Sequence, residues 1–534
     1  MNSERWFHVF VVCWLIVVAG IARWTGLENY ALSPDDVLIL GIAQSETLGE
    51  LFENASREVH PPMFYLVLRM VALFGSDEVF LRAVMMALGL LSIPVVYFAG
   101  VRFIPSKVGA VAMGLAAALS PGALLETTTL RHYALVVLLS SVGWFLFLWY
   151  RESRKSSVLY GYGVLVLLGI LTHYSQLILF GAIGVAHLIV LLSAKDTRKY
   201  AIRFCAVNVP GALVGLYFVW AHVTKQWMGS GHYDYIVNHA YRLIFPVDAE
   251  MWLNNTVDLG TWLSMAHVPG NVAGVLAILG LVILGFGRGR GLLAVILCVI
   301  GFQVIGTATK AYPFGSTRHC LYLLPIFAFA LGVGVGAPID WALRKVKKSQ
   351  RSARSMITRV ILLVGVSVPM TYIYVRDRSY RDSVPAHASY PVLSSDFAQL
   401  MSKLNEQVRP GMSIVTNRQS SMYLRYATKN ISGMQVADVL YKIPYRGADF
   451  YYLDDKSVAH DPPTLGALIE AAVHHGKIRP SQPVYLFTVG WNMSTIESLS
   501  QSPQLAPGEV LVANSSGVLL RLPLERLRRF FRRR

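Results

Sequence analysis

Charged residues are scarce in this chain. Only 15% of its 534 residues are Asp, Glu, Lys or Arg, whereas 54% are hydrophobic, and the mean hydropathy is +0.47. A soluble domain typically contains about 25% charged residues, because its surface must be solvated. The composition therefore excludes an ordinary soluble protein and predicts a chain that lies in a lipid bilayer.

Cysteine is also scarce, and no glycine-rich phosphate loop follows a predicted strand. The four cysteines, Cys13, Cys205, Cys298 and Cys320, lie in or beside apolar stretches without metal-type or redox-type spacing. They predict packing residues and exclude a disulfide framework or a cysteine zinc site. Without a glycine loop, a nucleotide-binding domain is not expected.

Basic residues outnumber acidic ones, 48 to 31, which gives a net charge of +17. In a soluble protein this excess would indicate nucleic acid, but here the basic residues form short clusters between apolar runs and one terminal tail. We expect no nucleic-acid partner and instead contact with membrane lipids. The tail RLRRFFRRR suits anionic headgroups, and a solvated, disordered tail explains its composition equally well.

Apolar runs long enough to cross a bilayer recur along the first 375 residues. About 20 apolar residues span the roughly 30 Å of hydrocarbon, and one cleaved signal peptide cannot account for so many runs. The predicted fold is a multi-spanning α-helical membrane protein with about eleven transmembrane helices. The predicted spans are residues 6–24, 78–102, 108–125, 132–150, 156–172, 177–193, 202–223, 265–287, 291–309, 319–339 and 359–375.

The distribution of basic residues predicts which loops face the cytoplasm, because cytoplasmic loops carry an excess of Lys and Arg. If the N-terminus is cytoplasmic, these clusters lie inside and nearly all unusual polar residues lie outside. We therefore expect the plasma membrane of a bacterium and a single extracytoplasmic site. The inside clusters are Arg102 with Lys107; Arg151, Arg154 and Lys155; Lys195, Arg198, Lys199 and Arg203; Arg288 with Arg290; and the stretch that begins at Arg344.

The last part of the chain has shorter apolar runs. The segments SIVTN, DFYYLD, PVYLFTV and EVLVAN have strand length and are separated by helix-like pieces and Pro/Gly turns. The predicted domains are a membrane module at 1–375 with a first outer loop near 25–77, an extracytoplasmic α/β domain at 376–523, and a basic tail at 524–534.

An ordered set of polar motifs lies in the predicted outer loops. Asp35 and Asp36 precede His60-Pro61-Pro62, and the segments LRHYALVVLLSS, LTHYSQLILF and RHCLYLLPIFAFAL follow at later span ends. In this order, residues 6–340 resemble the GT-C superfamily of membrane glycosyltransferases, and most closely its protein O-mannosyltransferase and lipid A aminoarabinose transferase group. The superfamily pair is commonly Asp-Glu, so its roles carry over less directly to Asp36 than to Asp35.

This resemblance implies a GT-C-like fold and an inverting glycosyltransferase. The donor would be a sugar on polyprenyl phosphate and the acceptor an extracytoplasmic glycan, lipid or protein. No cofactor would be obligatory, and we assign no metal ligand, although the superfamily leaves room for a divalent metal. Asp35 and Asp36 are the predicted catalytic residues, with Asp35 as general base, because the acceptor hydroxyl must lose a proton as it attacks.

The donor phosphate needs cationic or hydrogen-bonding partners near the headgroup plane. Arg131 and Arg318 are the predicted phosphate ligands, since a guanidinium binds two oxygens at once, and His60 and His173 are further candidates. Each has an alternative role: arginines at span ends snorkel to lipid phosphates, and histidines there often pack at the interface. The acidic pair is also a good helix cap.

Two other functions remain open. A transporter or flippase of lipid-linked sugars would place polar residues in mid-membrane, usually in repeated halves, and no internal repeat is evident. A non-catalytic assembly protein would bind through its C-terminal domain. The aromatic loop at 225–262 suits an acceptor or lipid cavity, or else an interfacial aromatic belt.

Overall fold

The structure is a computed structural model. It describes residues 3–29, 32–57, 60–193, 197–223, 245–265, 268–286, 289–344, 348–376, 394–410, 412–417, 420, 440–445, 448–453, 484–489, 509–514 and 517–522. The chain divides into two compact units. One comprises Met1–Leu27 with Ala55–Ala388, and the other Glu28–Asn54 with Ser389–Arg534.

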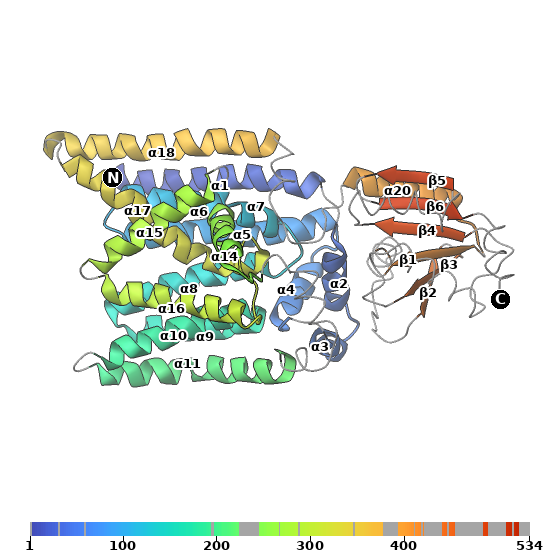
Figure 1. The fold of residues 1–534 in the computed structure, drawn as a ribbon, viewed down its shortest axis with the longest axis horizontal. Coiled ribbons are helices and arrows are strands. Elements are labelled where there is room, and N and C mark those ends of the chain that lie inside the picture. Colours follow the sequence, from blue (N-terminus) through green and yellow to red (C-terminus); the bar gives the residue numbers. More distant parts are fainter. Residues whose placement is uncertain are drawn as a thin grey trace. The chain divides into compact units, whose positions relative to one another are not determined.

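The first unit is helical, and most of its long helices lie with their axes roughly aligned (Figure 1). In the part of the chain that the structure describes, eight helices are long and apolar enough to cross a membrane. The helices are α1 (Ser3–Asn29), α4 (Met63–Ala72), α5 (Glu78–Phe103), α6 (Lys107–Leu119), α7 (Pro121–Glu126), α8 (Tyr133–Ser153), α9 (Ser156–Thr172), α10 (Ser175–Leu192), α11 (Arg198–Phe218) with the π-turn η1 (Val219–Val223), α14 (Ala249–Leu263), α15 (Gly270–Gly285), α16 (Arg290–Ala308), the 3₁₀ turn η4 (Arg318–Leu323), α17 (Leu324–Arg344) and α18 (Lys348–Arg376).

The predicted helical membrane fold class is confirmed, since each of the eleven predicted spans falls on one or two helical segments. Three of these helices, α6, α9 and α15, are shorter than the usual spanning length. The span predicted at 108–125 is broken at Ser120, which caps α7 by accepting a hydrogen bond from the amide of Ala123. Pro121 begins α7, where its missing N–H costs nothing, so the chain turns there instead of continuing α6.

Helices α15 and α17 approach so closely that only glycine fits between them. A Cβ on Gly280 would lie 1.9 Å from the carbonyl oxygen of Ala330, and one on Gly334 would lie 1.8 Å from that of Leu276. The two contacts are reciprocal and one helical turn apart. Small residues at this spacing let membrane helices gain van der Waals contact, which is a main source of helix association in lipid.

The second unit contains a six-stranded mixed sheet, which confirms the predicted β-containing C-terminal region (Figure 1). The strand order is β2-β3-β1-β4-β6-β5, with β1 parallel to β3 and β4 and the other pairs antiparallel. The strands are β1 (Ser413–Asn417), β2 (Leu440–Tyr445), β3 (Ala448–Leu453), β4 (Val484–Val489), β5 (Glu509–Asn514) and β6 (Gly517–Leu522).

Helix α20 (Ser394–Gln407) packs against this sheet. Its buried Leu400 and Leu404 meet Ile414, Phe487 and Leu519 in one apolar cluster. Two short helices from the first predicted loop, α2 (Pro34–Ala43) and most of α3 (Leu48–Arg57), belong to the same unit. The predicted helix around 464–477 and the basic tail at 524–534 lie outside the described residues. The predicted domain boundaries stay predictions.

The glycine contact predicts a position-specific effect of alanine in α15. We expect Gly280→Ala to lower the thermal unfolding midpoint in detergent, because the methyl group meets a backbone carbonyl; such overpacking typically costs about 1–3 kcal/mol. Gly274→Ala in the same helix is the matched control, since nothing lies within 4 Å of its Cβ position. Equal midpoints for the two variants would contradict the close approach.

Candidate functional site

Three histidines of the first unit form a compact cluster. The ring centroids of His60 and His132 are 4.1 Å apart, those of His132 and His173 4.3 Å, and those of His60 and His173 5.2 Å. His132 and His173 are almost fully buried, and His60 is half-buried. His319 stacks at the edge of this group, with its centroid 6.1 Å from that of His173.

Helix ends place these rings together. His132 is the N-cap of α8, and His173 is the C-cap of α9 just before α10 begins. His60 stands before Pro61-Pro62 and α4, and His319 lies in η4. Because α8, α9 and α10 alternate in direction, all of these helix ends lie at one end of the bundle.

Two arginines flank the cluster. Arg131 and Arg318 are both buried, with 4% and 8% of their surface exposed. The positive charge of Arg318 disfavours protonation of His60 and His173, and that of Arg131 disfavours protonation of His132. The guanidinium of Arg318 also lies over the ring of Tyr133, 5.8 Å from its centroid.

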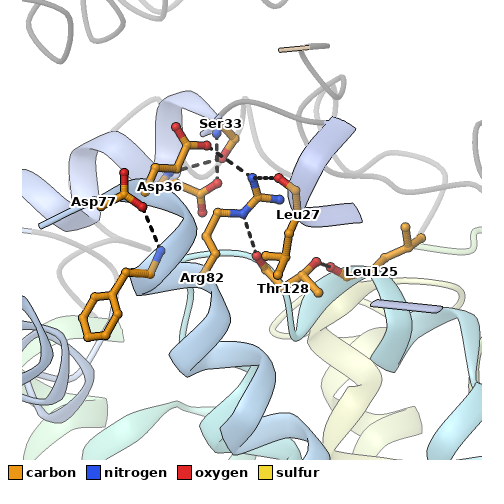
Figure 2. Close-up of polar contacts among 9 residues, drawn as sticks. Leu27, Ser33, Asp36, Asp77, Arg82, Leu125 and Thr128 are labelled. Carbon is orange, nitrogen blue, oxygen red and sulfur yellow. Dashed lines mark hydrogen bonds and ion pairs between the residues drawn. The ribbon is translucent and has the colours of Figure 1, made fainter. Parts of the chain in front are cut away.

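Two other buried arginines hold the turn that precedes Arg131. Arg23 donates from Nε to the hydroxyl of Thr127 at 2.9 Å. Arg82 donates from Nε to the carbonyl of Thr128 at 2.9 Å and from Nη1 to that of Leu27 at 3.3 Å (Figure 2). These arginines donate to acceptor oxygens of the protein itself, so they serve as scaffold for the site.

The loop that carries Arg318 is held by two buried amides. Gln303 donates to the carbonyl of Pro313 at 2.8 Å, and Asn255 donates to the carbonyl of Phe314 at 3.1 Å. Both side chains come from helices on either side of the loop, α16 and α14. They fix its backbone four and five residues before Arg318.

Further contacts orient this loop. Tyr322 donates to the side-chain oxygen of Gln303 at 2.5 Å, which leaves the amide nitrogen facing Pro313. Gly315 has a φ of 131°, which a side chain would strain. Tyr312 donates to the carbonyl of His319 at 3.1 Å, so the residue next to Arg318 is also fixed.

The hydrogen bonds of His173 determine which of its ring nitrogens carries the proton. The backbone N–H of Ser175 donates to Nδ1 of His173 at 3.1 Å, and the Ser175 hydroxyl lies 2.7 Å from the same atom. A backbone amide can only donate, so Nδ1 is an acceptor and the neutral ring is protonated at Nε2. His173 therefore offers an N–H donor to a ligand.

The histidines are held neutral. Burial lowers the pKa of His60 to about 3, and the charge of Arg318 adds to the effect. Burial is also the main reason that the pKa values of His132 and His173 lie well below their usual range. The neighbouring imidazoles and the flanking arginines lower these pKa values further. At neutral pH the site thus combines fixed guanidinium charges with uncharged rings.

The cluster suits an anion better than a divalent metal. Its ring nitrogens lie within 4.8 Å of one another, so their spacing alone does not exclude a tetrahedral zinc, whose nitrogen ligands lie about 3.3 Å apart. A metal-bound histidine normally donates its other N–H, but Nδ1 of His173 accepts. The charges of Arg131 and Arg318 would also oppose a cation. We assign no step to a metal.

The predicted acidic pair belongs to the second unit. Ser33 caps α2 in a reciprocal box: its hydroxyl accepts from the amide of Asp36 at 3.2 Å, and Oδ2 of Asp36 accepts from the amide of Ser33 at 2.9 Å (Figure 2). Asp36 is buried, so it fulfils the capping role that the sequence allows. Asp35 is half-buried in the first turn of the same helix.

The structure thus brings together four of the six predicted site residues, His60, Arg131, His173 and Arg318. It adds His132, which follows Arg131 in the segment LRHYALVVLLSS and was not among the predicted site residues. It also adds Gln303 and Asn255, whose positions in apolar helices give no signal in a single sequence. Residues 225–244 of the predicted aromatic loop lie outside the described residues.

Comparison with known proteins agrees with this description. The family model of dolichyl-phosphate-mannose-protein mannosyltransferases matches residues 59–225, a segment that contains His60, Arg131, His132 and His173. No curated protein sequence matches the chain.

Two solved structures have the same fold. ArnT from Cupriavidus metallidurans in the apo state is 14% identical, with 98% of this chain and 99% of that chain covered and a TM-score of 0.51. ArnT from the same organism bound to undecaprenyl phosphate is 13% identical, with 96% and 98% covered and a TM-score of 0.52. At this identity the likeness shows the fold, and it extends over nearly the whole chain.

The depressed histidine pKa values predict acid sensitivity. An unfolded histidine takes up a proton below about pH 6.5, whereas the folded rings stay neutral, so stability is full above that pH and falls as the pH drops toward 3. Each ring contributes at most about 1.4 kcal/mol per pH unit. Thermal unfolding midpoints measured from pH 8 to pH 5 give the dependence of stability on pH. His132→Gln should make this dependence less steep. An unchanged slope would contradict a neutral His132.

Proposed function

Because the chain is a membrane protein with the fold of the GT-C superfamily, as its sequence predicts, we propose that it is a glycosyltransferase. It takes a sugar from a polyprenyl-phosphate donor and passes it to a glycan, lipid or protein acceptor outside the cytoplasm. The mannosyltransferase family match over residues 59–225 and the undecaprenyl phosphate bound by ArnT support this donor class. The predicted topology supports the orientation.

The observation that carries the proposal is the pair of arginines beside uncharged histidines at one end of the bundle. The donor is a phosphodiester with one negative charge. When the bond between C1 and the phosphate oxygen breaks, the polyprenyl phosphate gains a second negative charge, because its second pKa is about 6. Arg131 and Arg318 stabilise this developing charge, and preorganised donors of this kind typically contribute about 10²–10³ in rate each.

His173 contributes an N–H donor without adding charge. A protonated imidazole would bind the donor and the product phosphate alike, whereas a neutral donor lets the product leave more easily. We propose that its Nε2–H donates a hydrogen bond to a phosphate oxygen or to a sugar hydroxyl. His60 and His132 line the same cluster, where their unprotonated nitrogens accept hydrogen bonds from the sugar.

Asp35 is the proposed general base. The acceptor oxygen attacks C1 as its proton passes to the Asp35 carboxylate, and the phosphate leaves with the electrons of the C1–O bond. Attack from the face opposite the phosphate inverts the anomeric carbon. Asp36 is engaged in the cap of α2, so its proposed part is to hold the helix turn that presents Asp35.

The role of Asp35 as general base is tested with membranes that contain the Asp35→Asn variant. The assay measures transfer of labelled sugar from a polyprenyl-phosphate donor. We expect transfer to fall by about 10²–10⁴, because a general base typically contributes that much. The matched control is Asp77→Asn, another capping aspartate of the predicted first outer loop, which should transfer at the wild-type rate. If Asp35→Asn transfers sugar at the wild-type rate, Asp35 is not the general base. If the wild-type protein itself transfers no sugar, a flippase or an assembly protein is favoured.

The phosphate ligands are tested by Arg318→Lys and Arg318→Ala. Lysine keeps the charge but loses the planar fork, so the apparent KM for the donor should rise about tenfold, and alanine should lower kcat/KM about 100-fold. Inhibition by polyprenyl phosphate alone should weaken in parallel, which separates phosphate recognition from general damage. Lys310→Gln, an exposed cation of the same loop, is the control and should change neither quantity.

Metal independence is tested by the same transfer assay with EDTA. Because the arginine-flanked site opposes a cation and phosphate leaves without Lewis-acid help, we expect at least about half of the transfer to continue after chelation. Abolition by EDTA with recovery on adding Mn²⁺ or Zn²⁺ would contradict this part of the proposal and would leave the donor class intact.

A further inference from the structure

A second group of basic residues lies at the other end of α8 from the histidine cluster. Arg151 is in the last turn of α8, and Arg154 caps it in the left-handed conformation with a φ of 55°. Lys199 and Arg203 of α11 approach from the side: Lys199 and Arg154 both lie over the ring of Tyr200, at 5.2 and 5.6 Å from its centroid. No carboxylate pairs with these cations in the described ranges.

Other basic residues at the same end are paired. Arg102 meets Glu152 at 2.7 Å, and Glu4 pairs with Lys107 and with Arg359. Carboxylates are therefore available at this end of the bundle, but among the described residues none forms an ion pair with Arg151 or Arg154. Among the described residues, Arg154 is met by aromatic rings and by His187, and both arginines lie at the partially negative C-terminal end of α8, but no carboxylate neutralises them.

His187 supplies an unused donor in the same place. It is 1% exposed and lies in α10, with Nε2 3.4 Å from Nη1 of Arg154. A guanidinium can only donate, so Nε2 accepts and the proton is on Nδ1. Nδ1 is buried and has no hydrogen-bond partner among the described residues. The charges of both Arg154 and Arg151 act on this ring.

The start of α16 adds positive potential. A Cβ on Gly291 would lie 3.0 Å from Nη2 of Arg151, so this guanidinium rests against the first turn of α16. The N-cap of α16, Gly289, provides no side-chain cap. A helix N-terminus carries a partial positive charge and exposes N–H groups, so a cation there is unfavourable unless an anion lies nearby.

We propose that the phosphate of an anionic membrane lipid binds here, between Arg151, Arg154 and the N-terminus of α16. A lipid is favoured over a free ion because the site is at the end of a membrane helix and apolar residues beside it face outward. Ile189, Leu192 and Ile202 are 58 to 63% exposed, as expected for residues that contact acyl chains. Basic pockets between helix ends recognise lipid headgroups in this way. The inference is independent of the transferase proposal.

The experiment measures lipid binding by native mass spectrometry of the full chain in neutral detergent. Phosphatidylglycerol, phosphatidylcholine and inorganic phosphate are titrated separately into wild type, Arg151→Gln/Arg154→Gln and Arg102→Gln. We expect the double variant to bind phosphatidylglycerol about 30-fold more weakly, because each basic residue near a headgroup contributes about a factor of five. Arg102→Gln, which removes a paired arginine, should bind as the wild type does.

Three outcomes would overturn the proposal. They are equal phosphatidylglycerol binding by the double variant and wild type, equal binding of phosphatidylcholine and phosphatidylglycerol, and full displacement of the lipid by millimolar inorganic phosphate. If the double variant elutes as an aggregate, Lys199→Gln/Arg203→Gln replaces it. Both of those side chains are exposed, so folding should survive, and a several-fold loss of phosphatidylglycerol is expected.

Discussion

A guanidinium group buried in a bilayer must find acceptors or a counter-charge, and this constraint organises the membrane unit. Arg23 and Arg82 satisfy it with hydroxyl and carbonyl oxygens at the turn between α7 and α8. By doing so they fix the backbone a few residues before Arg131. The same constraint makes the environments of Arg131 and Arg318 informative, since a protein that only needed stability would gain little from two guanidiniums beside a cluster of imidazoles.

The uncharged histidines are the counterpart of these arginines. A protonated imidazole among them would repel both guanidiniums in a medium of low dielectric, so the rings stay neutral and act through fixed tautomers. Recognition then depends on geometry: the Ser175 amide sets the proton of His173, and Gln303 and Asn255 set the loop of Arg318. Buried amides suit this task because each carries a donor and an acceptor without charge.

The sequence predicts the scaffold well because hydrophobic length is a local property. All eleven spans and the strands β1, β3, β4 and β5 were predicted from runs of residues that can be recognised one segment at a time. The positions of His60, Arg131, His173 and Arg318 followed from their place at helix ends. Contacts between segments could not be predicted in this way. The pairing of Gln303 with the Pro313 carbonyl and the approach of Gly280 to Ala330 join segments whose distance in space is not encoded by periodicity.

The two proposed phosphate sites lie at opposite ends of helix α8, whose length matches the thickness of the membrane. The helix has 21 residues, which corresponds to about 31 Å at 1.5 Å per residue and matches the roughly 30 Å hydrocarbon core. Arg131 and His132 precede its first turn, and Arg151 and Arg154 form its last. A helix of this length spans the hydrocarbon core, so under the two proposals the groups at its ends lie near opposite surfaces of that core. Under the two proposals each group binds a phosphate that the bilayer presents, and the group with neutral imidazoles would be the one that releases a phosphate after reaction.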